Sequence, residues 1–242
     1  MHVHLTGEWP LSQLDLYLAN GVTTVRDLDG RDFMLQWRDE IKAGKRAGPT
    51  IYTASPIIQG YEKDPPQLIL TRKSGYDCIK LYSYLSAPDF KKVMALAKEQ
   101  DVYTIGHIPF AVGLDGIIAH GMNEIAHVEE LLWELIDFDR HKELTPKAWF
   151  PYLKEAIYRQ YDSSFNFKLN ELKEMHHESI KANVKKLADR NISVCTTMYL
   201  DEVIIQKLFE PQKFLSQPTG AYLPQNYINS LLHGKEKNQA LI

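Results

Sequence analysis

The chain lacks the features that mark several common classes of protein. Only two cysteines, Cys78 and Cys195, occur among its 242 residues, so it has neither a disulfide framework nor a CxxC motif. No apolar run reaches the roughly 18 residues that a membrane-spanning helix needs. The net charge is only −3 and no lysine- or arginine-rich tract occurs, which argues against nucleic acid as the main partner.

Several functional motifs are also absent. There is no GxGxxG and no P-loop, so nucleotide binding has no support. There is no GxSxG nucleophile elbow and no HExxH zinc motif. No signal peptide is present either, but we expect the natural N-terminus to be missing, so the sequence leaves the compartment open.

What remains is the pattern of a globular α/β protein. Its length is enough to bury a sizeable core, as one domain or as two small ones. Short β-branched or apolar stretches alternate with amphipathic stretches of helical period. The expected strands are 2–5, 22–26, 50–54, 78–82, 102–107, 124–128 and 192–198. The expected helices are 11–20, 33–43, 88–100 and 112–120, and a helical, loop-like tail spans 202–242.

Alternating strands and helices predict right-handed crossovers and a parallel sheet. Seven such units fit a (β/α) barrel better than an open doubly wound sheet. The fold class that we predict is therefore α/β, an incomplete eight-stranded TIM-like barrel with seven recognisable strands. We expect one barrel domain over 1–242, with a polar, helix-rich insertion after strand six at about 130–190.

The sequence opens on a pair of histidines, His2 and His4. Successive side chains of a strand point to opposite faces, so residues two apart share a face. Imidazole is the commonest protein ligand for zinc and similar ions. The pair therefore indicates half of a metal site, although a chance pair on a frayed terminus has the same sequence.

Three more residues lie in or at the end of expected strands. Lys80 falls inside a buried strand, where an ammonium is costly unless it is paired, chemically changed or able to reach solvent. His107 and His127 end strands five and six, and each has the alternative of a core histidine bonded to a carbonyl. Because parallel strands gather their carboxyl ends on one face, we expect all three beside His2 and His4.

Other residues near these strands have plainer interpretations. Asp27 follows strand two, where capping a turn is the simplest role and facing the site the alternative. Tyr82 shares a face with Lys80 and is a candidate for lining a substrate pocket. Cys78 lies two residues deeper on that face, which suggests packing. The remaining histidines lie in polar helical stretches and suggest no shared ligand.

The order of these residues resembles the metal-dependent amidohydrolase superfamily. It is most similar to the branch that contains imidazolonepropionase-like enzymes and metal-dependent dipeptidases of the prolidase type. The matching stretches are 1–5 (MHVHL), 18–27 (LANGVTTVRD), 75–82 (GYDCIKLY), 106–109 (GHIP) and 121–130 (GMNEIAHVEE). No single stretch is specific, but their order along the first two hundred residues is.

The resemblance implies a divalent metal centre, with zinc as the first expectation. His2 and His4 would bind the more buried ion, and His107 and His127 would bind a second one. Lys80 would be carboxylated and bridge the two ions. It also implies hydrolysis of an amide or peptide-like C–N bond in a small molecule; a cyclic amide, a dipeptide and an N-acyl amino acid all stay open.

The sequence departs from the family pattern after strand seven. The catalytic aspartate of strand eight is not found, so no catalytic residue is assigned; Asp201, the one late aspartate, lies where a helix is expected to start. The small lobe that precedes strand one in the family is also missing. We therefore expect a fragment of low activity, and a non-catalytic scaffold that binds metal or a partner is the alternative.

A missing eighth strand would affect how the chain associates with other molecules. A barrel closes by pairing its first and last strands, and closure removes exposed edges. Without an eighth strand, strands one and seven would present unpaired backbone groups. We therefore expect self-association through these edges, in addition to a small-molecule substrate.

Overall fold

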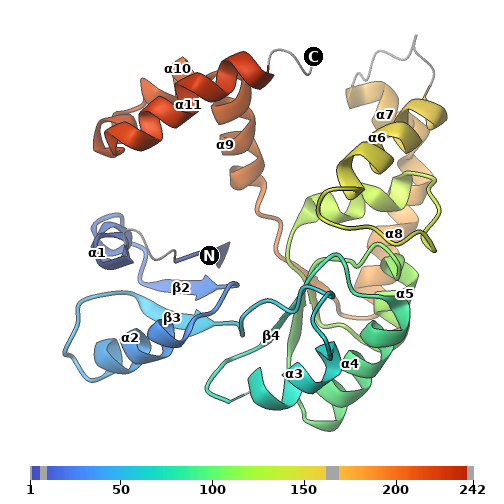
Figure 1. The fold of residues 1–242 in the computed structure, drawn as a ribbon, viewed down its shortest axis with the longest axis horizontal. Coiled ribbons are helices and arrows are strands. Elements are labelled where there is room, and N and C mark those ends of the chain that lie inside the picture. The colour runs from blue at the N-terminus through green and yellow to red at the C-terminus, as the bar shows by residue number, and fades with distance from the viewer. Residues whose placement is uncertain (1, 6–9, 73, 162–168, 239–242) are drawn as a thin grey trace. The chain divides into compact units, whose positions relative to one another are not determined.

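The structure, a computed structural model, describes residues 2–5, 10–72, 74–161 and 169–238 (Figure 1). The chain divides into two compact units, Met1–Cys195 and Thr196–Ile242. The first unit contains all the described strands and every residue that the sequence singled out as a ligand.

All seven described strands run parallel and form two sheets. The first sheet has the order β1-β2-β3 and the second the order β4-β5-β6-β7. Isolated bridges from Ala54 to Cys78 and from Ile58 to Leu81 join the segment after β3 to β4. The strands are β1 (His2–Val3), β2 (Thr24–Asp27), β3 (Thr50–Thr53), β4 (Ile79–Leu81), β5 (Thr104–Gly106), β6 (Glu124–Ile125) and β7 (Ser193–Val194).

The prediction of a parallel α/β fold with seven strands and an unclosed barrel is confirmed. Strand order follows chain order through both sheets, as it does in a barrel wall. Within the described ranges, no strand joins β7 back to β1. The wall is also interrupted between β3 and β4, where the bridges take the place of a continuous ladder.

Helices connect the strands of the first unit. Those that follow strands one to five are α1 (Pro10–Ala19), α2 (Asp32–Lys42), α3 (Pro65–Arg72), α4 (Ala87–Glu99) and α5 (Gly113–His120). The segment between β6 and β7 holds η1 (Val128–Leu131), η2 (Trp133–Leu135), α6 (Trp149–Gln160), α7 (Leu169–Met175) and α8 (His177–Asp189).

The predicted helices agree with these to within about two residues, but α3 was missed. Its sequence begins with Pro65 and Pro66, which suggest a loop. Proline is nevertheless accepted in the first turn of a helix, where its missing N–H has no intrahelical partner.

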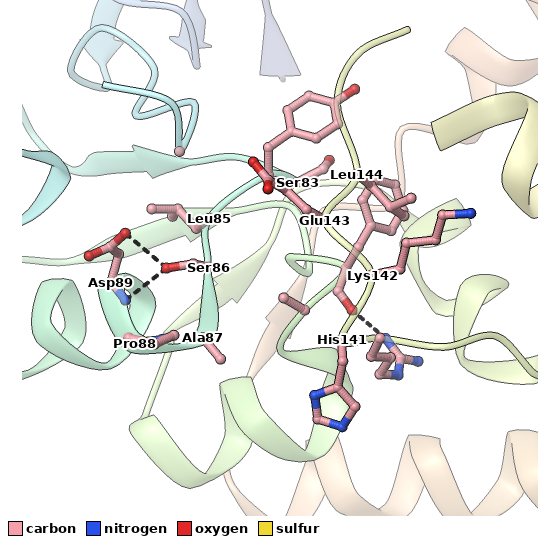
Figure 2. Close-up of a pocket in the computed structure, with 15 residues that line it drawn as sticks. Ser83, Leu85, Ser86, Ala87, Pro88, Asp89, His141, Lys142, Glu143 and Leu144 are labelled. Carbon is pink, nitrogen blue, oxygen red and sulfur yellow. Dashed lines mark hydrogen bonds between the residues drawn. The ribbon is translucent and has the colours of Figure 1, made fainter. Parts of the chain in front are cut away.

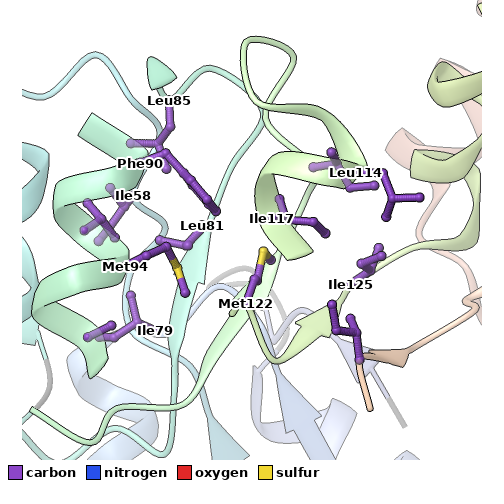
Figure 3. Close-up of a cluster of buried hydrophobic side chains, with 14 of the residues drawn as sticks. Ile58, Ile79, Leu81, Leu85, Phe90, Met94, Leu114, Ile117, Met122 and Ile125 are labelled. Atoms are coloured by element: carbon purple, nitrogen blue, oxygen red, sulfur yellow. The ribbon is translucent and has the colours of Figure 1, made fainter. Parts of the chain in front are cut away.

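Four hydrophobic clusters lie among the described residues of the first unit, and the two largest pack strands against helices. The larger lies between β4–β7 and helices α3, α4, α5 and α8; Figure 3 shows Leu81, Phe90 and Ile117 within it. The smaller packs β1–β3 against α1 and α2 through Val25, Trp37 and other apolar side chains. The opposite face of the strands carries polar side chains together with a smaller apolar cluster, formed by Leu28, Ala54, Cys78, Ile105 and Ala126.

An ion pair connects the two sheets. Both guanidinium nitrogens of Arg26, in β2, donate to the carboxylate of Glu124, in β6, at 2.8 and 2.5 Å. The hydroxyl of Tyr103 donates to the same carboxylate at 3.1 Å. A bidentate pair of this kind has a fixed geometry, so it sets the distance between β2 and β6.

The second unit is helical. It comprises α9 (Met198–Phe209), α10 (Pro211–Leu215), η3 (Pro218–Tyr222) and α11 (Gln225–Asn238). Asp201 lies in the first turn of α9, as its sequence context predicted. No helix in the described parts of either unit is long and apolar enough to cross a membrane.

Gly106 generates a testable prediction about the second sheet. A Cβ at this position would lie 2.0 Å from the carbonyl oxygen of Leu81, in the neighbouring strand. Gly106→Ala must push β5 away from β4, and we expect it to lower the free energy of unfolding by about 3 kcal/mol or more. Urea denaturation measures this value.

The matched control is Gly44→Ala. Gly44 has a positive φ but open space around its Cβ position, so alanine there costs only backbone strain of about 1–2 kcal/mol. Equal losses in the two variants would show that β5 can move away from β4 at no cost.

Candidate metal-binding site

Four imidazole rings form one cluster at the carboxyl ends of the strands. His2 lies in β1 and His4 one residue after it, while His107 follows β5 directly and His127 lies two residues beyond β6. Ring centroids are 5.1 Å apart for His2 and His4, and 4.9 Å apart for His2 and His127. The rings of His107 and His127 are also 4.9 Å apart. The structure thus brings together the four histidines that the sequence singled out.

The two histidines at β1 are the closest pair. Their Nε2 atoms lie 3.1 Å apart. Two nitrogens that bind one tetrahedral zinc at about 2.0–2.1 Å are roughly 3.3 Å from each other. His2 is half-buried and His4 is exposed, so the pair reaches from the cluster toward solvent.

Lys80 is the most unusual residue of the site. It is the central residue of β4 and only 1% exposed, and its Nζ has no hydrogen-bond partner among the described groups. Burial lowers the pKa of this amine to about 8, although the nearby carboxylate of Glu130 opposes the shift. An amine in this position is therefore much easier to deprotonate than an ordinary lysine.

The imidazoles are held in their uncharged form. Burial lowers the pKa of His2 to about 3 and that of His127 to about 2, with further contributions from Lys80 and the neighbouring rings. The pKa values of His4 and His107 are also lowered, chiefly by the loss of water around each ring, although His4 is exposed as a whole residue. A neutral imidazole keeps a lone pair on one nitrogen, which is the form that binds a metal ion.

His107 has two polar neighbours that the sequence did not predict. Its Nδ1 lies 2.6 Å from Oε1 of Glu130 and 2.9 Å from Oγ of Ser83. Glu130 is 4% exposed, although the sequence suggested only that it begins the polar insertion. The available signal was its place in the His-Val-Glu-Glu stretch that follows strand six.

Asp27 ties the end of β1 to the end of β2. Its carboxylate is fully buried and accepts the backbone N–H of Leu5 at 2.5 Å and that of Asp29 at 2.7 Å. The bond to Asp29 is the turn-capping role that we predicted. The bond to Leu5 was not predicted, and it holds the backbone directly after His4.

Tyr82, the predicted substrate contact, lies against the cluster. Its ring centroid is 4.2 Å from that of His107 and 5.8 Å from that of Tyr84. Cys78, which the sequence suggested for packing, is buried among Leu28, Ala54 and other apolar side chains.

A cavity of about 490 Å³ begins next to the cluster. Ser83 lines it and also contacts His107, so the cavity and the histidines share this residue. Figure 2 shows the segment 85–89 on one side and the segment 141–144 on the other. Tyr84 and Phe110 add aromatic surface, and Arg140 adds a cation that already contacts Glu134.

The donor atoms of the cluster do not have the geometry of a metal site. In the part of the chain that the structure describes, no three or more His, Cys, Asp or Glu side chains are arranged to hold a metal ion. The rings touch, but their donor atoms do not all face one point. The chemistry of the donors nevertheless fits a divalent ion, because four neutral imidazoles lie near a buried amine that has no hydrogen-bond partner among the described groups.

Comparisons with known proteins give partial structural matches. No protein-family model matches the chain, and no curated protein matches its sequence. A Xaa-Pro dipeptidase with bound methionine has 19% identity and a TM-score of 0.42, over 56% of this chain and 50% of the dipeptidase. Bottromycin amidohydrolase has 21% identity and a TM-score of 0.46, over 60% of this chain and 34% of that protein.

A third match is the ochratoxinase of A. niger, with 14% identity and a TM-score of 0.44 over 80% of this chain and 60% of the enzyme. The chain therefore spans less than two thirds of the length of each of these proteins. At this identity and overlap the matches assign no activity to the chain.

Asp27 leads to a prediction about pH. Burial raises the pKa of its carboxyl to about 6, above the value of about 3.9 in an unfolded chain. The folded state therefore binds this proton more tightly than the unfolded state does. The contribution of Asp27 to the free energy of unfolding should fall by about 2–3 kcal/mol as the pH rises from about 4 to about 6, and stay level above that.

Asp27→Asn should remove this dependence. Asparagine has one acceptor oxygen for two backbone N–H groups, which lowers stability by an amount that does not vary with pH. Urea denaturation of both proteins between pH 4 and pH 8 gives the difference, in which other titrating groups cancel. A difference that is the same at every pH would contradict the prediction.

Proposed function

We propose that this chain carries the core of a metal-dependent hydrolase that acts on amide or peptide-like C–N bonds of small molecules. Its metal ligands would be the side chains at the carboxyl ends of four strands: His2, His4, Lys80, His107 and His127. They would hold one or two divalent ions, with zinc as the first candidate. The observation that carries the proposal is the contact of four uncharged imidazoles beside the buried amine of Lys80, which has no partner.

The position of Lys80 suggests that its amine is carboxylated when metal is bound. A cation next to a bound dication would be repelled, whereas a lysine carbamate is an anionic oxygen ligand. The lowered pKa of Lys80 supports this form, because only the neutral amine adds to CO₂. In that addition the nitrogen lone pair forms the N–C bond, one C=O π pair of CO₂ moves onto oxygen, and the nitrogen gives up a proton to water.

The remaining residues suggest how a substrate would lie. A bound divalent ion supplies a water of lowered pKa and polarises a carbonyl group. Tyr82 packs against His107, so it would contact the substrate beside the cluster. The cavity beyond Ser83 would receive a substituent on one side of the amide, and its lining of aromatic and charged side chains suits a group that is partly polar.

The leaving amine must be protonated, and no residue is assigned to this step. A non-catalytic chain that binds metal without turnover is therefore the second candidate. The observation in its favour is that the donors described here do not yet form a ready metal site. Side-chain rotation is needed for either function, and the χ2 torsion of histidine has broad minima.

The proposal predicts metal-dependent activity that the cluster controls. The full chain, treated with chelator and reloaded with zinc, should bind the ion and hydrolyse members of a panel of dipeptides, N-acyl amino acids and cyclic amides. His127→Ala should lower bound zinc and reduce the rate by about 10³-fold, since a metal supplies several kcal/mol of transition-state stabilisation.

His177→Ala is the control for this experiment, because His177 is an exposed residue of α8. It should leave both zinc content and rate unchanged. Zinc binding without hydrolysis would support the non-catalytic candidate. Unchanged zinc binding in His127→Ala would exclude the cluster as the metal site.

A second prediction separates the effect of Lys80 on stability from its effect on metal binding. Lys80→Met removes a buried polar group and keeps a side chain of similar length. Without metal, we expect it to raise the free energy of unfolding by about 1–3 kcal/mol, because the unpartnered amine no longer has to be buried. The same variant should bind zinc more weakly.

Urea denaturation in chelator and zinc titration calorimetry measure the two effects. Lys98→Met, at an exposed position of α4, is the matched control and should change stability by less than about 0.5 kcal/mol. If Lys80→Met bound zinc as tightly as the unsubstituted chain, Lys80 would not be a ligand.

A further inference from the structure

The two contacts at Nδ1 of His107 determine where its proton lies. Oε1 of Glu130 is 2.6 Å from this nitrogen, which is within hydrogen-bonding distance. A carboxylate can only accept, so Nδ1 must donate. Ser83 Oγ, at 2.9 Å, is then a second acceptor for the same N–H.

This arrangement leaves one lone pair on the ring. A ring that binds a metal ion is neutral, and a neutral ring carries a single proton. With that proton on Nδ1, the lone pair lies on Nε2, on the other side of the ring. The opposite tautomer would set a lone pair of Nδ1 against the carboxylate of Glu130.

Glu130 is itself held in place. Its second oxygen, Oε2, accepts the backbone N–H of Ile108 at 2.9 Å, and the side chain is buried. The residue therefore binds both the ring of His107 and the backbone of the next residue. It reaches them from η1, which follows β6, so it also connects the ends of β5 and β6.

The corresponding distance from His127 to its neighbouring glutamate is longer. Its Nδ1 is 3.5 Å from Oε1 of Glu129, whose side chain is 35% exposed. That distance is too long for a charge-assisted hydrogen bond. Of these two histidine–glutamate distances, the one between His107 and Glu130 is the shorter.

We propose that Glu130 is a positioning residue, which holds His107 in the Nδ1–H tautomer and so presents Nε2 as the ligand atom. This rests on the proposed metal-binding function. Histidines that bind metals commonly donate their other ring N–H to a carboxylate, which fixes the ring and raises its basicity. Glu130 would act through His107 and would not itself touch the ion.

The first test uses the unsubstituted full chain without metal. Two-bond ¹H–¹⁵N correlation spectra of the ring nitrogens distinguish the tautomers, and His107→Asn assigns the His107 signals. We expect the Nδ1–H tautomer at pH 7.5. An Nε2–H tautomer would overturn the inference, and this readout does not depend on any variant folding.

The second test is Glu130→Gln. Glutamine offers one acceptor oxygen to two donors, Nδ1–H of His107 and N–H of Ile108. We expect a mixture of tautomers at His107 and a 10- to 100-fold loss of zinc affinity, measured with zinc ions alone. Ser83→Ala removes only the longer of the two contacts at Nδ1 of His107 and should preserve the tautomer.

Glu124→Gln is the matched control for the loss of a buried carboxylate. Glu124 bonds to Arg26 and not to His107, so this variant should lose stability and keep the Nδ1–H tautomer. If both glutamine variants mixed the tautomers equally, Glu130 would have only a structural role. If zinc bound to the unsubstituted chain but the tautomer were wrong, the inference alone would fail; if zinc did not bind, the proposed function would fail.

Discussion

The burial of Lys80 is the constraint on which the candidate site depends. A primary amine that has lost its water and has no hydrogen-bond partner is costly, and a domain has only about 5–15 kcal/mol of net stability. The same dry environment lowers the pKa values of the neighbouring imidazoles. A protein retains such a group where the amine is chemically altered or bound in the working state, and this connects the buried lysine to the histidines around it.

Parallel strand direction explains why the sequence could predict the main residues of the site. In a parallel sheet every carboxyl end lies at the same edge, so residues at strand ends become neighbours even when they are far apart in the chain. His2, Lys80 and His107 could be placed together on this ground alone. The strands proved shorter than expected, and His127 lies beyond β6 where it was expected near the end of that strand. The cluster forms all the same, because the segments that follow the strands continue toward the same region.

The supporting residues could not be predicted in the same way. Glu130 and Ser83 have the sequence context of a loop, and their importance comes from contacts with His107 that no periodicity encodes. Asp27 was predicted to cap a turn, but its bond to Leu5 depends on the pairing of β1 with β2. Helix α3 was missed because its two initial prolines suggest a loop when the rest of the fold is unknown. In each case a tertiary partner decides the role, and local sequence carries no information about that partner.

The ion pair between Arg26 and Glu124 has a consequence for sequence variation. Glu124 is buried and Arg26 only partly so, and removing Arg26 would leave the carboxylate of Glu124 without its charged partner, which is destabilising. Replacing both residues by apolar groups can be neutral. A substitution at only one of the two positions is therefore unfavourable, although they are 98 residues apart in the chain. In related sequences we expect substitutions at the two positions to be correlated. Such a correlation would indicate that β2 and β6 lie close together.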